Sequence, residues 1–313
     1  MKYKVFIDGA EGTTGLKIHQ YFQKRDDIDL LKIDQEKRKD LDERLSLIKQ
    51  ADISFLCLPD AAAREIAAAA PAECRILDTS TAHRTDPSWV YGMPELCEGQ
   101  REKIKNSNRV AVPGCHATGV ILLIKPLLEA GLVPADYPFC ACSLTGYSGG
   151  GKKMIAQYES PERQRGNMGG QDILCSPRQY GIAQAHKHLP EIIAATGISS
   201  APAFSPIVAD YYSGMEVTVP IKVDGLTKAD VEKAVAGYYK DQPLVTVKEA
   251  LDEGGFIAAG QLSGTNRLEI TVEGNDENIL LVAVYDNLGK GASGAAIQNM
   301  NIMLGIDETK GLI

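Results

Sequence analysis

The 313-residue sequence predicts an α/β protein made of two domains. In its first third, short apolar runs alternate with helical patterns at the spacing of βαβ units, which predicts a parallel sheet. After about residue 117 the pattern changes to strand-like runs and covering helices, which predicts a mixed or antiparallel sheet. The length supports this division, because a single hydrophobic core rarely grows through so many residues.

The first domain is expected to begin with a strand at Lys4–Ile7, a loop at Gly9–Gly15 and a helix starting at Leu16–Phe22. Ile53–Leu58 is apolar throughout, as expected for a strand that is buried on both faces. The other elements predicted here are the strands Leu30–Ile33, Arg75–Leu77 and Arg109–Val112 and the helices Leu41–Ile48 and Ala61–Ala70.

The second domain shows helices and paired strands. Leucines at 122, 123, 127 and 128 form a helical stripe, and Thr227 with Asp230 resembles a capping box at a helix start. Gly274–Asn275 lies between two strand-like runs and predicts an antiparallel pair. The strand-like runs are Met215–Val223, Arg267–Val272 and Ile279–Val284. A last helix, Ala292–Leu304, is too apolar to stand alone and must dock elsewhere.

The composition excludes several classes of protein. A net charge of -8, from 33 basic and 41 acidic residues, argues against a broad nucleic-acid-binding or membrane-binding surface. Seven cysteines without a CxxC pair indicate a reduced protein. The apolar run Val5–Ile7 is too short for a signal peptide, and no stretch is long enough for a membrane span. We therefore expect a cytoplasmic protein.

The loop Gly9–Gly15 has the context of a dinucleotide-binding loop, because it joins a strand to a helix. Its glycines at 9, 12 and 15, together with Thr13 and Thr14, would bring backbone N–H groups close to a pyrophosphate. The spacing is GxxGxxG, and a tight turn without a ligand would look the same. Asp34 would suit the ribose of NAD, whereas Lys37, Arg38 and Lys39 would suit the 2′-phosphate of NADP, so these residues leave the choice open.

Cys115 lies between a strand and a helix, in the run Pro113-Gly114-Cys115. A thiol at a helix N-terminus has a lowered pKa, which favours the nucleophilic thiolate. We therefore expect Cys115 to be a covalent nucleophile. Buried, inert positions are expected instead for four other cysteines, Cys57, Cys74, Cys140 and Cys142.

An acid/base partner is expected from the segment His186-Lys187-His188, with Glu191 close enough to orient an imidazole. His188 is slightly favoured over His186. The His-x-His pair also resembles half of a metal site, but no other ligands complete it, so we expect no metal.

Binding of an anionic substrate would require local positive charge. Arg84 is the strongest candidate, because it follows a strand end, where open α/β sheets bind ligands. Ser148 and Gly149 belong to a glycine-rich loop that suits a place near substrate or nicotinamide, or is a plain linker. The other basic candidates are Lys152, Lys153, Arg163, Arg165 and Lys187.

Together these segments resemble N-acetyl-γ-glutamyl-phosphate reductase of arginine biosynthesis in its short bacterial form. The resemblance covers nearly the whole chain. It rests on the glycine loop and on the runs Leu56–Asp60, Pro113–Cys115, His186–Glu191 and Asp286–Ala295. The glycine loop alone is shared with aspartate-semialdehyde and glyceraldehyde-phosphate dehydrogenases, which look like structural relatives.

The resemblance implies a Rossmann domain at 1–116, completed by the C-terminal helix at 287–313, and an α+β catalytic and dimerisation domain of the glyceraldehyde-phosphate dehydrogenase type at 117–286. It implies NADP(H), the nucleophile Cys115 and a histidine of the 186–188 pair. It also implies cofactor contacts from Cys57, Pro59, Ser80, Asn287, Lys290 and Gly291. His83 and His116-Ala117 depart from the pattern of the longer family members.

The implied reaction is NADPH-dependent reduction of N-acetylglutamyl 5-phosphate to the 5-semialdehyde through a cysteine thioester, by a homo-oligomer of two or four chains. An aspartate-semialdehyde dehydrogenase or another acyl-phosphate reductase is the nearest alternative. A Cys-His hydrolase or acyltransferase would need no nicotinamide, and a non-enzymatic dinucleotide sensor would need no activated thiolate.

Overall fold

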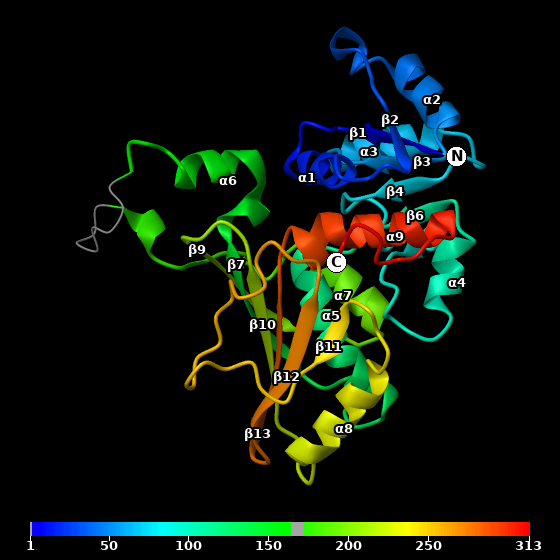
Figure 1. Cartoon of the computed structure of the whole chain (residues 1–313). Coiled ribbons are helices and arrows are strands. Elements are labelled where there is room, and N and C mark those ends of the chain that lie inside the picture. The colour runs from blue at the N-terminus through cyan, green and yellow to red at the C-terminus, as the bar shows by residue number, and fades with distance from the viewer. Residues whose placement is uncertain (1, 164–171) are drawn as a thin grey trace. The chain divides into compact units, whose positions relative to one another are not determined.

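The computed structural model describes residues 2–163 and 172–313 (Figure 1). The chain separates into two compact units. One unit consists of the residues up to Gly114 together with Ala292–Ile313, and the other is Cys115–Gly291. Among the described residues, none of the helices has both the length and the apolar character that a membrane crossing requires.

The first unit is built on a parallel sheet, as predicted. Its strands follow the spatial order β2-β1-β3-β4-β6-β5, and every neighbouring pair runs parallel. The order reverses between β1 and β3, so the carboxyl ends of these two strands flank a crevice. The strands are β1 (Tyr3–Asp8), β2 (Ile28–Leu31), β3 (Ile53–Leu56), β4 (Ile76–Asp78), β5 (Val90–Tyr91) and β6 (Arg109–Ala111).

Helices cover the sheet of the first unit. Apolar side chains of α2 (Leu41–Gln50) and α3 (Asp60–Ala69) form one core with Phe6, Leu56 and Ile76 of the strands. The C-terminal helix α9 (Gly294–Leu304) contacts β4 and the helices α1 (Thr13–Phe22) and α4 (Gln100–Lys105) (Figure 1). Every residue of α9 except the last is buried, which explains how so apolar a helix is kept from water.

The second unit is built on a mixed sheet, also as predicted. Its strands follow the order β11-β12-β13-β10-β7-β9-β8, in which β11/β12 and β7/β9 are parallel and the other neighbours antiparallel. The expected antiparallel pair is the hairpin of β12 and β13, where Gly274 has a φ of +86°. The strands are β7 (Cys140–Gly146), β8 (Arg178–Gln179), β9 (Ala203–Ala209), β10 (Met215–Ile221), β11 (Val245–Val247), β12 (Leu268–Asn275) and β13 (Asn278–Tyr285).

Helix α5 (Cys115–Glu129) carries the predicted leucine stripe and packs on β10 and β13. It also contacts α7 (Leu189–Thr196) and α8 (Lys228–Tyr238). The capping box predicted at the start of α8 is present, with reciprocal bonds between Thr227 and Asp230. Helix α6 (Gly151–Tyr158) follows β7 and lies apart from this group (Figure 1).

The prediction that Cys140 and Cys142 are buried is wrong. Both lie on the same side of β7, as their spacing requires, but that side is exposed while Ala141 and Ser143 face the core. Cys57 and Cys74 are only partly exposed, and burial raises the pKa of both thiols, to about 12 for Cys57. A raised pKa disfavours the reactive thiolate, so inertness stays a prediction for these two cysteines, although neither is fully buried.

Candidate active site

The glycine turn after β1 uses each of its three glycines differently. Gly9 has a φ of +83°, and a Cβ there would overlap the Cys57 carbonyl oxygen. A Cβ on Gly15 would lie 2.6 Å from the Gly9 carbonyl oxygen, so Gly15 lets α1 pack tightly against the turn. Gly12 meets no such obstacle and forms the N-cap of α1, without a side-chain cap. A tight turn, an open middle glycine and a packing glycine are the roles that a pyrophosphate loop requires.

The turn also lies where the sheet topology expects a ligand. Gly9 follows β1, and Cys57 follows β3, the two strands between which the strand order reverses. The Cys57 N–H donates to the Asp8 carbonyl at 2.8 Å, and Pro59 is the N-cap residue of α3. The predicted cofactor residues Gly9, Gly12, Cys57 and Pro59 therefore share one crevice.

One of the basic residues expected at the ribose, Arg38, lies beside this turn. Arg38 forms an exposed ion pair with Glu11 of the turn at 3.2 Å, and Lys37 pairs with Glu43 at 3.4 Å. Asp34 is already used locally, since its carboxylate accepts the Glu36 N–H at 3.0 Å. Each of the two cations is thus already paired with a glutamate, and the Asp34 carboxylate is partly engaged.

A buried polar cluster follows β4. Asp78 accepts from the Ser80 hydroxyl at 2.8 Å and lies 2.6 Å from Nδ1 of His83, whose ring stacks on Trp89. Arg84 donates to the carbonyl oxygens of Val112 at 2.9 Å and Thr79 at 3.1 Å. These bonds hold Arg84 at the carboxyl end of the sheet, as predicted, with part of its donor capacity engaged by backbone.

Cys115 is the first residue of α5 and is partly exposed. The expected strand–turn–helix context of the thiol is therefore present. Burial raises the pKa of Tyr180 well above its usual range, and the negative charge of the Cys115 thiolate adds to that rise.

Three histidine rings gather beside the nucleophile turn. The ring centroids of His186 and His188 are 4.7 Å apart, and that of His116 lies 5.6 Å from His186 and 5.7 Å from His188. The ring centroid of Phe204 lies 5.5 Å from that of His116. In the part of the chain that the structure describes, no group of His, Cys, Asp and Glu side chains has an arrangement that would hold a metal ion.

His116 forms a buried network that the sequence analysis did not predict. Its Nδ1 lies 2.6 Å from the Ser143 hydroxyl, and its Nε2 is hydrogen-bonded to the Tyr180 hydroxyl. Burial lowers the pKa of His116 to about 3, with smaller contributions from His186 and Lys187. The His116 ring is therefore neutral, and both of its nitrogens are occupied.

His188 and His186 differ in their surroundings. His188 is 5% exposed, and its Nε2 lies 4.0 Å from a carboxylate oxygen of Glu191, which is 1% exposed. His186 is more exposed, and its Nδ1 accepts the His188 N–H at 3.2 Å. Burial, and then the charge of Lys187, lowers the pKa of His186. The structure thus brings together His186, His188 and Glu191 as the sequence predicted.

The segment after β13 returns to Cys115, the predicted nucleophile. A Cβ on Gly291 would lie 3.1 Å from the Cys115 Cβ. Asn287 is buried, donates to the Ser148 hydroxyl at 3.0 Å and accepts the Gly214 N–H at 2.9 Å. Lys290 is buried in the turn η4 (Gly289–Ser293), whereas Gly149 is exposed. Of the residues assigned to the cofactor, Ser148, Asn287 and Gly291 thus converge in the second unit.

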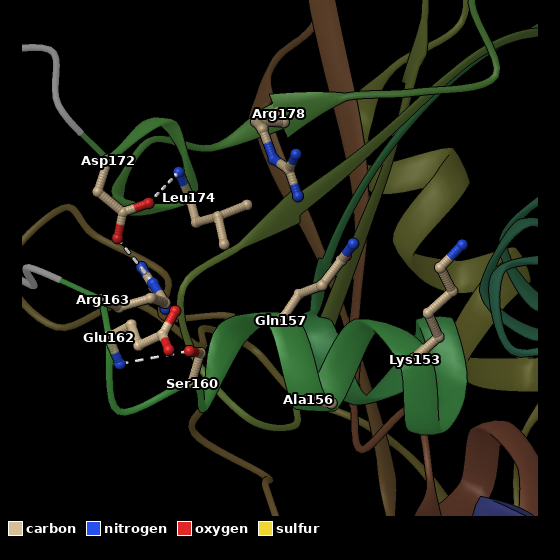
Figure 2. A pocket seen from close by; sticks show the side chains of 9 residues that line it. All are labelled: Lys153, Ala156, Gln157, Ser160, Glu162, Arg163, Asp172, Leu174 and Arg178. Carbon is tan, nitrogen blue, oxygen red and sulfur yellow. Dashed lines mark hydrogen bonds and ion pairs between the residues drawn. The ribbon is translucent and has the colours of Figure 1, made fainter.

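A cavity of about 890 Å³ lies between α6 and the chain that leads to β8 (Figure 2). Arg163 lines it but is neutralised by Asp172 at 2.7 Å and Asp210 at 2.9 Å. Arg178 also lines it and donates to the Tyr158 hydroxyl at 2.9 Å. The other lining residues are Lys153, Ala156, Gln157, Ser160, Glu162, Asp172 and Leu174.

Among the described residues, no carboxylate is paired with Arg178, and its buried Nε has no hydrogen-bond partner. Arg178 precedes Tyr180 by two residues, so the alternation of an extended chain places the two side chains on one side. Sequence reasoning missed Arg178, because nothing in the run Pro177–Tyr180 distinguishes it. Among the predicted basic residues, Lys152 and Lys187 are exposed, and Arg165 lies outside the described residues.

The chain matches two family models of semialdehyde dehydrogenases. Residues 4–107 match the family model of the semialdehyde dehydrogenase NAD binding domain, and residues 115–287 match that of the semialdehyde dehydrogenase dimerisation domain. Aspartate semialdehyde dehydrogenase II from Vibrio cholerae, in a crystal structure with ASA, superposes with a TM-score of 0.72 at 16% identity, covering 97% of this chain and 99% of the other. This similarity shows the fold alone.

More similar relatives narrow the class. N-acetyl-gamma-glutamyl-phosphate reductase 2 of Nostoc sp. is 44% identical over 99% of both chains. The N-acetyl-gamma-glutamyl-phosphate reductase of Brucella anthropi is 43% identical over 97% of this chain and 99% of its own. The chain belongs to the N-acetyl-gamma-glutamyl-phosphate reductase family.

Proposed function

We propose that this protein reduces N-acetylglutamyl 5-phosphate to N-acetylglutamate 5-semialdehyde in arginine biosynthesis, through a thioester on Cys115. The observation that carries the proposal is the cluster of His116, His186 and His188, of which His116 and His188 are buried and His116 directly follows a thiol at a helix N-terminus. The names of the relatives supply the substrate, and the geometry supports the chemistry.

NADPH is the proposed reductant. The family model supports a pyridine nucleotide, and the crevice at Gly9 and Cys57 fits its pyrophosphate. Lys37 and Arg38 would hold the 2′-phosphate, which distinguishes NADP from NAD. We therefore assign cofactor binding to the unit that contains the glycine turn and the covalent chemistry to the unit that begins at Cys115.

The Cys115 thiolate attacks the acyl carbon, the bond from that carbon to the phosphate oxygen breaks, and phosphate leaves. When bound, the cofactor supplies a hydride to the thioester carbonyl. Amides of the first turn of α5 stabilise the oxyanion. The C–S bond then breaks, the aldehyde leaves, and the thiolate is restored. His188, oriented by Glu191, donates a proton to the departing phosphate oxygen and takes a proton from solvent before the next cycle.

Arg178 is proposed to bind the substrate carboxylate. Arg178 is partly exposed, its buried Nε has no hydrogen-bond partner, and no carboxylate is paired with it among the described residues, which favours an anion. Tyr180, two residues further along the chain, is hydrogen-bonded to His116. Arg84, at the carboxyl end of the parallel sheet, remains the candidate for the phosphate.

We also propose that the protein is a cytoplasmic homo-oligomer. The match to a dimerisation domain over residues 115–287 supports self-association. All seven cysteines are thiols, which supports a reducing compartment.

The deciding experiment runs the reaction in reverse. The protein, N-acetylglutamate 5-semialdehyde and NADP⁺ should generate NADPH only when inorganic phosphate is present. Aspartate semialdehyde at the same concentration is the control substrate. Equal or faster turnover of aspartate semialdehyde would overturn the substrate assignment, and turnover without phosphate would overturn the acyl-phosphate chemistry.

A further inference from the structure

The hydroxyl of Tyr285 joins two backbone groups of the nucleophile turn. It donates to the Cys115 carbonyl oxygen at 2.6 Å and accepts the Gly119 N–H at 3.1 Å. In a regular α-helix the N–H of residue i+4 donates directly to the carbonyl of residue i. Cys115 and Gly119 are such a pair, so the hydroxyl bridges the first helical hydrogen bond of α5.

Gly119 makes this approach possible. A Cβ at that position would lie 2.7 Å from the Tyr285 hydroxyl oxygen and 2.6 Å from Cγ2 of Val217. Any larger residue would push the first turn of α5 away from the sheet. Because Gly119 has no side chain, the Tyr285 hydroxyl can come within hydrogen-bonding distance of the helix backbone.

The hydroxyl itself is held firmly. Tyr285 is fully buried at the end of β13, where it pairs with Met215 of β10 and Leu268 of β12 in the interior of the sheet. Burial raises the pKa of Tyr285 well above its usual range, and the charge of the Cys115 thiolate adds to this rise. The hydroxyl thus keeps the proton that it donates to the Cys115 carbonyl.

The chain after Tyr285 supports the same turn from a second direction. The Gly291 N–H donates to the Asp286 carbonyl at 3.0 Å, which folds the chain back so that Gly291 lies against Cys115. Asp286 also accepts from the N–H of Leu288 at 2.7 Å. The segment 285–291 therefore contacts the Cys115 backbone through a hydroxyl and its Cβ through a glycine.

We propose that Tyr285 is a positioning residue for Cys115. Its hydroxyl sets the first turn of α5 so that the amides of that turn face the sulfur and the acyl oxygen. The effect on turnover rests on the function proposed above, whereas the effect on the thiol does not. Tyr285 has no part in binding substrate or cofactor in this proposal.

The chain offers a matched control on the same helix. Tyr239 is 3% exposed, and its hydroxyl donates to the Leu122 carbonyl of α5 at 2.6 Å. Tyr239→Phe removes a buried tyrosine–carbonyl bond of the same kind two turns away from the nucleophile. A general loosening of α5 would affect both tyrosine variants alike.

The experiment measures the alkylation rate of Cys115 by iodoacetamide between pH 5 and 9, with peptide mass spectrometry separating Cys115 from the exposed Cys140 and Cys142. In Tyr285→Phe we expect slower alkylation, displaced to higher pH, because the first-turn amides no longer face the sulfur. We expect kcat to fall between about 10-fold and 100-fold, with the KM for NADPH unchanged. Tyr239→Phe should keep the wild-type profile and kcat.

Each outcome decides the proposal. A wild-type alkylation profile in a folded Tyr285→Phe, or an equal displacement in Tyr239→Phe, would overturn it. If circular dichroism shows that Tyr285→Phe does not fold, Gly119→Ala, which displaces the turn but keeps the tyrosine, takes its place with the same expectation. If the wild-type protein fails to reduce the acyl phosphate, the proposed function is wrong, and the alkylation profiles still decide the role of Tyr285.

Discussion

Two strand-to-helix turns in this protein are built in opposite ways. The turn at Gly9–Gly15 is held by its own glycines and by the neighbouring Cys57 carbonyl, and the helix that it begins has no side-chain cap. The turn at Cys115 is held by Tyr285, which is 170 residues away in the sequence, and is surrounded by buried imidazoles. A turn that binds a ligand through backbone amides needs room for the ligand to approach the backbone. A turn that holds a reactive side chain needs neighbouring residues that fix the position of that side chain.

This difference predicts that a substitution in one turn leaves the function of the other turn intact. Cys115→Ser should reduce turnover by at least about 10³-fold, because a serine hydroxyl is a far poorer nucleophile in this setting. Binding of NADPH should persist, since the glycine turn is independent of the sulfur. Fluorescence titration with NADPH alongside the turnover assay tests both halves. Retained turnover would refute the covalent route.

A second prediction concerns Arg178, which lines the cavity beside α6. Arg178→Gln should raise the KM for N-acetylglutamate 5-semialdehyde by about 10-fold to 100-fold, since a hydrogen bond to a charged group contributes about 1.5–3 kcal/mol. The KM for NADP⁺ should not change. Lys152→Gln is the control, because Lys152 is exposed on the adjacent helix. Equal effects of the two variants would show that only general positive charge matters.

The buried imidazole predicts a pH dependence of stability. His116 has a pKa of about 3 in the folded protein against a usual value of 6.5. Below pH 6.5 the His116 side chain is protonated in the unfolded chain but stays neutral in the folded protein. The free energy of unfolding therefore decreases as the pH falls. Between pH 7 and pH 5 the loss from this one site is about 2 kcal/mol.

Urea denaturation of the wild-type protein and of His116→Gln at pH 7 and pH 5 measures this contribution. The variant should lose about 2 kcal/mol less than the wild type between the two pH values. His19→Gln, at a half-exposed histidine of α1, should behave as the wild type. An unchanged pH dependence in His116→Gln would mean that His116 is not held neutral.

The smallest expected effect lies at the glycine turn. The double change Lys37→Ala and Arg38→Ala should raise the KM for NADPH by about 10-fold, because exposed charge pairs contribute little individually. The KM for NADH should stay close to its wild-type value. Lys49→Ala is a control on another exposed part of the same unit. An equal loss of NADH and NADPH binding would remove the argument for a 2′-phosphate site.

Sequence reasoning succeeded where structure is local. The parallel strands, the leucine stripe of α5, the β12–β13 hairpin and the capping box at Thr227 all follow from residues close in the chain. It missed short elements such as α4, α6 and β8, whose few residues carry no clear period. It also misjudged Cys140 and Cys142, because a period of two says which residues share a face but not whether that face is covered.

In the candidate site, too, the local features could be predicted and the contacts between distant segments could not. The sequence shows the glycines that permit the first turn and the cysteine at the start of α5. Both can be recognised because the turn and the residue that it requires are neighbours in the chain. The partners of His116, the unpaired Nε of Arg178 and the bridge from Tyr285 to Cys115 depend on contacts between distant segments. The sequence by itself thus determined the two sheets and the place of Cys115 at a helix start. Only the tertiary structure decided which side chains surround that atom, because packing selects neighbours by space and not by order in the chain.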